Sequence, residues 1–163
     1  MGNDVQKAIR SSIETEKSAM YFYRMGAVKM KDKAARELFE LLAREEREHA
    51  GQFNSIYKGG DIPSLDDYLD TPPDAASQWL VSISRLIETD FTEKKAMELA
   101  MEREKSLEEE LEKFASRTFD PEVQKVYEMN AKETRNHYQM IESEYARIMA
   151  MVHETDMDIY VRE

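Results

Sequence analysis

A glutamate and a histidine stand three residues apart in the stretch REEREHAGQF. They are Glu46 and His49, and this spacing places both side chains on the same side of a helix. The apolar residues Leu38, Leu42 and Phe53 follow the helical period on that side, so it is expected to face a core. Carboxylate oxygen and imidazole nitrogen suit iron, manganese and zinc. The pair therefore points to metal ligands inside a helical core.

The second half of the chain repeats this pattern. One ungapped offset aligns KAIRSSIETEKS with KAMELAMEREKS, and the same offset brings Asp120 onto Asp32. It also places Glu104 on Glu16, in the middle of an apolar stripe, and His137 on His49. A match that runs through two helices and their turn without a gap indicates two related hairpins about a pseudo-twofold axis.

The elements that must position these residues are four long helices. The 3.6-residue period runs through residues 4–29, 32–58, 92–117 and 120–152. Asp120 is expected as the N-cap of the last helix, with Pro121 at its first position. Short links predict antiparallel hairpins, 4–58 and 92–152, joined by a long crossover, 59–91, that contains one short helix. Residues 153–163 are expected to form a C-terminal tail, with His153 as a tail or packing residue. The prediction is one all-α domain over residues 1–163, an antiparallel four-helix bundle.

Three carboxylates facing one core need compensation. A buried, unpaired carboxylate costs several kcal/mol, and neighbouring carboxylates repel one another. The nearby basic residues, which are expected to lie off the stripes, are Lys17, Arg47, Lys105 and Arg135. A divalent cation would compensate the carboxylates instead. A single glutamate is usually solvated and a single core histidine is usually hydrogen-bonded to protein. The coincidence of both residue types at repeated positions is what favours metal.

Composition excludes several function classes. The 163 residues carry a net charge of −11, which disfavours nonspecific binding to nucleic acid or to anionic membranes. The absence of cysteine excludes thiol catalysis, disulfides and a rubredoxin-type iron site. No apolar run approaches the ~20 residues of a membrane span, and no signal core opens the chain. A cytoplasmic location is the expectation.

The motifs ETEKSAMYFY, EEREHA and EREKS resemble the rubrerythrin branch of the ferritin-like superfamily. The resemblance covers the four long helices. It implies a ferritin-like bundle that holds two iron ions, commonly as a homodimer. Without cysteine such a protein needs an external electron donor, such as a rubredoxin-like protein. The metal ligands implied by position are Glu16, Glu46, His49, Glu104 and His137.

The sequence departs from the family pattern at two positions. The family carries a second Glu-x-x-His on the fourth helix, but the residue three before His137 is Thr134. Glu133, one residue earlier, is the nearest carboxylate. Members of the family also often carry a glutamate where this chain has Met101. The pattern leaves open a lopsided metal pair, a single metal, or a pair completed by Glu133.

Three functions follow from these residues. The leading hypothesis is a nonhaem diiron oxidoreductase that reduces hydrogen peroxide or dioxygen, or oxidises ferrous iron. Its cofactor would be two iron ions, although zinc and manganese suit the same donors. The alternative is a non-enzymatic protein with one metal, iron or zinc, for storage, delivery or sensing. A third hypothesis is a metal-free bundle that presents a partner surface. Tyr23 and Thr134 are candidates to lie beside the site.

Overall fold

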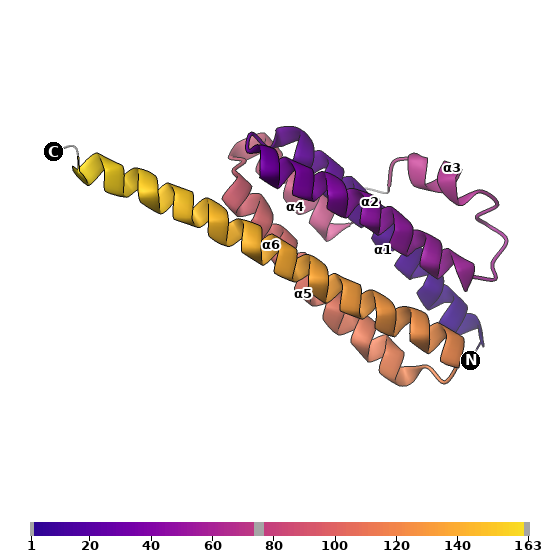
Figure 1. The fold of residues 1–163 in the computed structure, drawn as a ribbon. Coiled ribbons are helices and arrows are strands. Elements are labelled where there is room, and N and C mark those ends of the chain that lie inside the picture. Colours follow the sequence, from indigo (N-terminus) through magenta and orange to yellow (C-terminus); the bar gives the residue numbers. More distant parts are fainter. Residues whose placement is uncertain (1, 74–76, 162–163) are drawn as a thin grey trace.

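The computed structural model describes residues 2–73 and 77–161, with side chains described for residues 4–73 and 77–151. Within these residues the chain forms six helices and no strand (Figure 1). They are α1 Gly2–Lys29, α2 Lys33–Ser55, α3 Leu65–Asp70, α4 Gln78–Thr89, α5 Glu93–Arg117 and α6 Pro121–Val161. The predicted all-α fold is confirmed, and the four long helices lie where the period placed them.

Two helical hairpins build the bundle. α1 packs along α2 and α5 packs along α6, while α2 contacts α6 between the hairpins (Figure 1). The crossover adds α4, which contacts both α1 and α5. The long helices therefore present their inner sides to a common interior, as the repeated apolar stripes predict.

Capping side chains fix where three of the long helices begin. Asp32 caps α2 and Thr92 caps α5, each accepting a hydrogen bond from the backbone N–H three residues later. Asp120 accepts hydrogen bonds from two backbone N–H groups in the first turn of α6, and Pro121 is the first residue of that helix. The predicted start of α6 is confirmed. These caps satisfy N–H groups that have no partner within the helix.

The crossover contains two helices, although the sequence predicted one. α4 corresponds to the predicted short helix, whose first residues fall outside the described part of the chain. α3 was not predicted. The Ser64 hydroxyl caps it by accepting a hydrogen bond from the backbone N–H of Asp67 at 3.3 Å. A serine followed three residues later by an acidic residue is a helix-start signal, so α3 could have been found in the sequence.

α6 is longer than predicted. Residues 153–163 were expected to form a tail, but the helix continues through 153–161 and ends at Val161. Neither glycine nor proline follows Pro121, so no residue in this part of the sequence breaks the helix. The side chain of His153 lies outside the described side chains, and its role stays a prediction. Among the helices described, none is long and apolar enough to cross a membrane.

The core consists of two apolar clusters. One contains Phe22, Phe39 and Met97, and the other contains Ile13 and Leu111. Along each long helix the chain passes from one cluster to the other through a short buried polar stretch. Each stretch holds one or two of the five predicted ligand residues. The fold thus places a polar layer between two dry apolar layers.

Candidate metal centre

All five predicted ligand residues are buried and converge from four helices. Glu16 comes from α1, Glu46 and His49 from α2, Glu104 from α5 and His137 from α6. Each is at most 2% exposed. The mid-helix positions on the apolar stripes account for this convergence, because a residue on a stripe that faces the core must face it too. The structure brings together every residue of the predicted set.

The five side chains form two groups that share Glu46. We call Glu16, Glu46 and His49 the first triad, and Glu46, Glu104 and His137 the second triad. In each triad one candidate ligand atom per residue lies within 4.8 Å of the others. The shared carboxylate between two histidines is the arrangement expected where one side chain serves two neighbouring ions.

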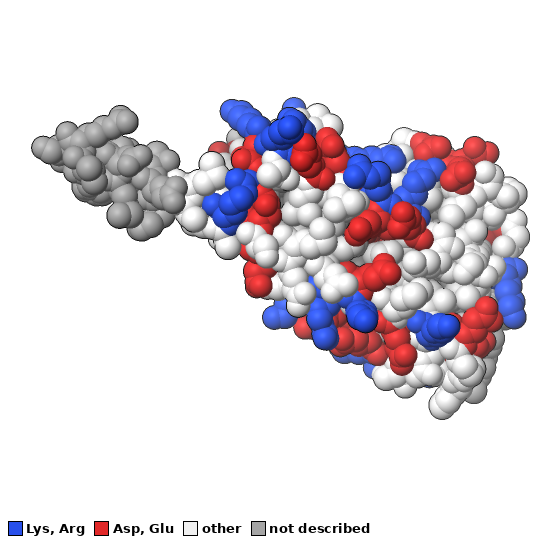
Figure 2. Space-filling view, in the orientation of Figure 1, with Lys and Arg blue, Asp and Glu red and all other residues white. Residues whose placement is uncertain are grey.

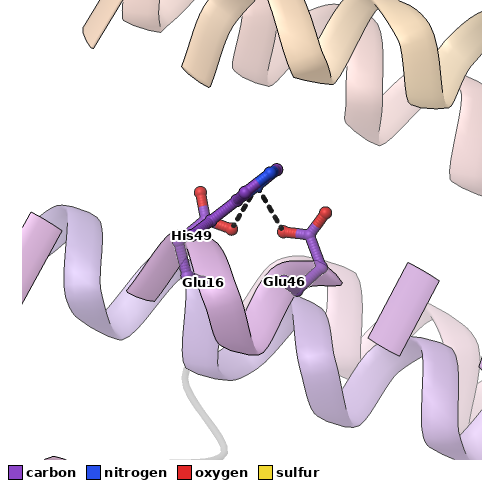
Figure 3. A group of neighbouring side chains, drawn as sticks. All are labelled: Glu16, Glu46 and His49. Carbon is purple, nitrogen blue, oxygen red and sulfur yellow. Dashed lines mark ion pairs between the residues drawn. The ribbon is translucent and has the colours of Figure 1, made fainter. Parts of the chain in front are cut away.

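In the first triad the ring of His49 faces two carboxylates. Its Nδ1 atom lies 3.7 Å from Oε2 of Glu16 and 3.9 Å from Oε2 of Glu46. Figure 3 shows the three side chains gathered together, with dashed lines running from the His49 ring to the carboxylates of Glu16 and Glu46. These separations are longer than hydrogen bonds and leave space between three donor atoms.

The second triad uses the other oxygen of the shared residue. The Nδ1 atom of His137 lies 3.0 Å from Oε1 of Glu46 and 3.9 Å from Oε1 of Glu104. The two imidazole rings stack at a centroid distance of 5.2 Å and an interplanar angle of 12°. The two Nδ1 atoms therefore face the carboxylate layer from neighbouring positions.

Several inward-facing polar atoms of this layer have no hydrogen-bond partner among the described residues. They are Oε2 of Glu16, both side-chain oxygens of Glu46, Oε2 of Glu104, and Nδ1 of His49 and His137. Buried polar groups in folded proteins are normally satisfied, because desolvation without a bond is costly. A cation that accepts electron pairs from carboxylate oxygen and imidazole nitrogen would satisfy these atoms together. The donor set fits iron, manganese or zinc.

The outer nitrogen of each histidine is already held by a carboxylate. Nε2 of His137 lies 2.6 Å from Oε2 of Glu45, and Nε2 of His49 pairs with Oε2 of Glu133. If each Nε2 carries the proton and donates it, each Nδ1 keeps a free lone pair for a metal. Glu45 and Glu133 are equivalent in the repeat, so the two contacts are related by the pseudo-twofold axis. The offset in the sequence was the signal that could have identified Glu45.

A family model described as Rubrerythrin matches residues 7–145. The chain belongs to the rubrerythrin family. The matched residues include both triads and both outer carboxylates. Family membership implies iron binding and an oxidoreductase-type role. Comparison with curated proteins and with solved structures gave no match.

This rubrerythrin-family chain lacks a carboxylate on α6 beside His137. Thr134 occupies that position and is buried, but its hydroxyl donates a hydrogen bond to the backbone carbonyl of Asn130 at 2.7 Å. Glu133 does not take its place, because its carboxylate holds the outer nitrogen of His49. Met101 is half-buried and brings no charge. The centre therefore has three inner carboxylates.

A buried arginine that the sequence analysis missed enters the same layer. Arg103 is 3% exposed and donates a hydrogen bond from Nη1 to Oε1 of Glu104 at 3.0 Å. Its Nη2 atom lies 4.0 Å from Oε2 of Glu46. Tyr23, a candidate to lie beside the site, also donates a hydrogen bond to Oε1 of Glu104. Arg103 stands next to Glu104 in the sequence, and neighbouring helix residues point about 100° apart, so the periodicity argument passed over it.

The other basic residues considered in the sequence stay away from the centre. Lys17 is buried, but its Nζ lies over the ring of Tyr68 at 4.0 Å. Arg47 pairs with carboxylates of α3, and Arg135 pairs with carboxylates of α5. Lys105 is exposed. The prediction that these four do not neutralise the layer agrees with their positions.

Proton affinities in the metal-free layer are strongly perturbed. Burial and the neighbouring Glu46 carboxylate raise the pKa of Glu16 to about 8. Burial would lower the pKa of both histidines, but the carboxylates outweigh it, raising the pKa of His49 to about 9 and that of His137 to about 11. Burial also opposes ionisation of Glu46, yet the neighbouring Glu16 and His137 side chains outweigh it and lower the pKa of Glu46. Protons therefore compensate the layer when no metal does.

Proposed function

We propose that this protein is a nonhaem diiron oxidoreductase that reduces hydrogen peroxide or dioxygen, or oxidises ferrous iron. The observation that carries the proposal is the pair of buried triads that share Glu46 and point unpaired oxygen and nitrogen atoms at each other. Membership of the rubrerythrin family supports iron over the other metals that suit these donors.

Each triad would hold one iron ion, and Glu46 would contact both. Iron bound there supplies one-electron chemistry between its ferrous and ferric states. The three carboxylates supply negative charge that favours the ferric state. Glu45 and Glu133 keep the outer histidine nitrogens protonated, so that the inner nitrogens are available as ligands. The apolar layers on both sides exclude water, which strengthens the electrostatic interactions within the layer.

A small cavity gives the first triad an approach from the surface. It has a volume of about 110 Å³ and is lined by Glu16 together with Ser11, Thr15, Glu110 and Tyr127. This volume accommodates a molecule of the size of peroxide or dioxygen. The hydroxyl and carboxylate groups in the lining can hydrogen-bond a small polar substrate or guide a cation.

Electrons would come from a separate protein in a cytoplasmic setting. The chain contains no cysteine and hence no rubredoxin-type iron site of its own. A rubredoxin-like donor and a homodimeric assembly are part of the proposal. Figure 2 shows acidic and basic side chains interspersed on this face, so docking there would use local charge pairs rather than one acidic field.

The test is anaerobic loading of the metal-free protein with Fe(II), followed by hydrogen peroxide. Wild type should bind iron and oxidise it faster than free iron oxidises. Glu46→Gln removes the shared carboxylate with little change of shape and should abolish both properties. Glu48→Gln on the exposed side of α2 is the matched control and should behave as wild type. Binding of less than one equivalent of iron by wild type, or oxidation no faster than in buffer, rules the proposal out.

A second candidate is a metal-binding protein with one ion, for storage, delivery or sensing. The observations that favour it are the missing carboxylate at Thr134 and the ion pair of Arg103 in the second triad. Elemental analysis separates the candidates. Two ions per chain with rapid peroxide turnover support the oxidoreductase, whereas one ion without turnover supports the binding protein.

A further inference from the structure

We propose that Arg103 is a resident cation that makes the two triads unequal. The first triad takes the first metal ion, and the second triad takes its ion only when the Arg103 guanidinium withdraws. This inference rests on the proposed metal centre and adds an order of loading that the family alone does not give.

The contacts of Arg103 fall mainly on the second triad. Its Nη1 atom donates to Oε1 of Glu104, a residue that belongs to the second triad alone. The same oxygen accepts a hydrogen bond from Tyr23, so two donors already engage it. A metal ion at Glu104 would meet a positive charge a few Å away in a water-poor interior, where like charges repel strongly.

The carboxylate that belongs to the first triad alone is held differently. Among the described side chains, no arginine donates a hydrogen bond to Glu16, whose ion pair is with His49, and a metal ion would replace His49 as the partner. The nearest approach of the guanidinium to this triad is through the shared Glu46, at 4.0 Å. The first triad therefore offers a metal ion two carboxylates, and Arg103 hydrogen-bonds neither of them.

The sequence departure on α6 weakens the same triad. Thr134 lies one helical turn before His137, where a carboxylate would add negative charge beside the second triad. The threonine hydroxyl instead bonds the α6 backbone. One carboxylate fewer and one guanidinium more both lower the affinity of the second triad for a divalent cation.

A cavity beside Arg103 gives the guanidinium a place to go. Arg103 lines a cavity of about 620 Å³ between α1, α5 and the crossover. Glu110 is also in its lining and can compensate a guanidinium that leaves Glu104, whereas Glu14 on the opposite wall already pairs with Arg10. Trp79, the single tryptophan of the chain, lines the same cavity and can report a change there.

The first experiment is a titration of the metal-free protein with Zn²⁺ against a chromophoric chelator. Zinc suits these donors and does not change oxidation state. Wild type should bind two ions in two steps, with the second at least about tenfold weaker than the first, the consequence of one nearby like charge. Arg103→Gln should tighten the second step by about tenfold and leave the first within about threefold. Arg135→Gln removes a surface arginine of α6 and should leave both steps unchanged.

The outcomes separate this inference from the proposed function. Two equal binding steps in wild type, or an unchanged second step in Arg103→Gln, overturn the role of Arg103 and leave the metal centre standing. A wild type that binds no metal refutes the proposed function and the inference together. Circular dichroism before the titration shows whether the variant has folded.

Two measurements on wild type test the inference without any variant. A crystal grown with one equivalent of Zn²⁺ should show its anomalous peak between Glu16, Glu46 and His49, and a peak at the second triad overturns the inference. Trp79 emission should change with the second equivalent. A change confined to the first equivalent, or no change, contradicts the withdrawal of Arg103 into the cavity.

Discussion

The two hairpins of this protein carry the same pattern and hold their charges differently. Glu16 matches Glu104, and each histidine is gripped from outside by the carboxylate of the opposite hairpin. The repeat is broken at one inner position, where the first hairpin has Glu46 and the second hairpin has Thr134 at the equivalent place in the sequence. A centre built from a repeat thus keeps its geometry while its two halves acquire unequal charge.

This difference shows that position and electrostatic environment vary independently. Glu16 and Glu104 are equally buried at equivalent sites. Glu16 faces a carboxylate and a histidine, whereas Glu104 accepts hydrogen bonds from Arg103 and Tyr23. Substituting each glutamate in turn should therefore have different consequences.

The largest difference is expected between Glu104→Gln and Glu16→Gln in the metal-free protein. Glu104→Gln leaves the buried Arg103 without its carboxylate, and breaking a buried pair costs roughly 3–5 kcal/mol. Glu16→Gln should cost less than about 1 kcal/mol at pH 7, because a pKa near 8 keeps Glu16 mostly protonated and glutamine resembles the protonated acid. Urea unfolding measures both values.

Glu48→Gln, on the exposed side of α2, is the control for a charge removed without burial. Equal losses for the two buried variants would show that the arginine does not distinguish the triads. If both buried variants were more stable than wild type, the metal-free bundle that presents a partner surface would be favoured, because the buried carboxylates would then not serve as metal ligands.

The second effect is the pH dependence of the metal-free protein. The folded state raises the pKa of His49 to about 9 and of His137 to about 11, above the ordinary value of 6.5, and that of Glu16 to about 8. Between pH 6.5 and 9 the folded state therefore binds more protons than the unfolded chain, so stability falls as the pH rises. Each of the three groups accounts for roughly 2–3 kcal/mol, so we expect the free energy of unfolding to fall by several kcal/mol over this range.

Urea unfolding at pH 6.5, 7.5 and 9 measures the slope. Metal ions replace these protons, so zinc affinity should rise over the same range and the loaded protein should lose less stability. Stability that is flat or rising in the metal-free protein would show that protons do not compensate the layer.

The sequence predicted the geometry of the centre and missed its charge compensation. Helical period and the repeat were sufficient for the positions of Glu16, His49 and their equivalents, because a stripe that faces the core fixes the direction of every residue on it. Arg103 lies off that stripe, and its long side chain reaches the layer by a rotamer that depends on tertiary packing. The pairing of Glu133 with His49 could not be predicted from the sequence pattern either, because it depends on the distance between α2 and α6. α3 was missed although its serine cap was readable.

The third effect compares the outer carboxylates. Glu133→Gln should weaken the first metal-binding step, because it loosens His49, and Glu45→Gln should weaken the second step through His137. Loss of such an outer partner typically costs about 10–100-fold in metal affinity. Chelator-competition titrations with Zn²⁺ resolve the two steps.

Controls for this comparison are exposed glutamates on the same helices, Glu48→Gln on α2 and Glu128→Gln on α6. Both should leave the titration unchanged. If Glu133→Gln and Glu45→Gln weakened the same step, the assignment of one histidine to each triad would be wrong.

The smallest difference is expected between the two helix caps that the repeat places at equivalent positions. Asp120→Ala removes the cap of α6 and should cost about 1 kcal/mol. Asp32→Ala removes the cap of α2 and also the ion pair with Arg147, a residue of α6, so it should cost about 0.5 kcal/mol more. Urea unfolding in low and high salt measures this excess, which should shrink with salt because the pair is partly exposed. In a double-mutant cycle, Arg147→Ala should remove the additional cost of Asp32→Ala. If Asp32→Ala and Asp120→Ala lowered the free energy of unfolding equally, the ion pair between Asp32 and Arg147 would add nothing to the contact between the hairpins.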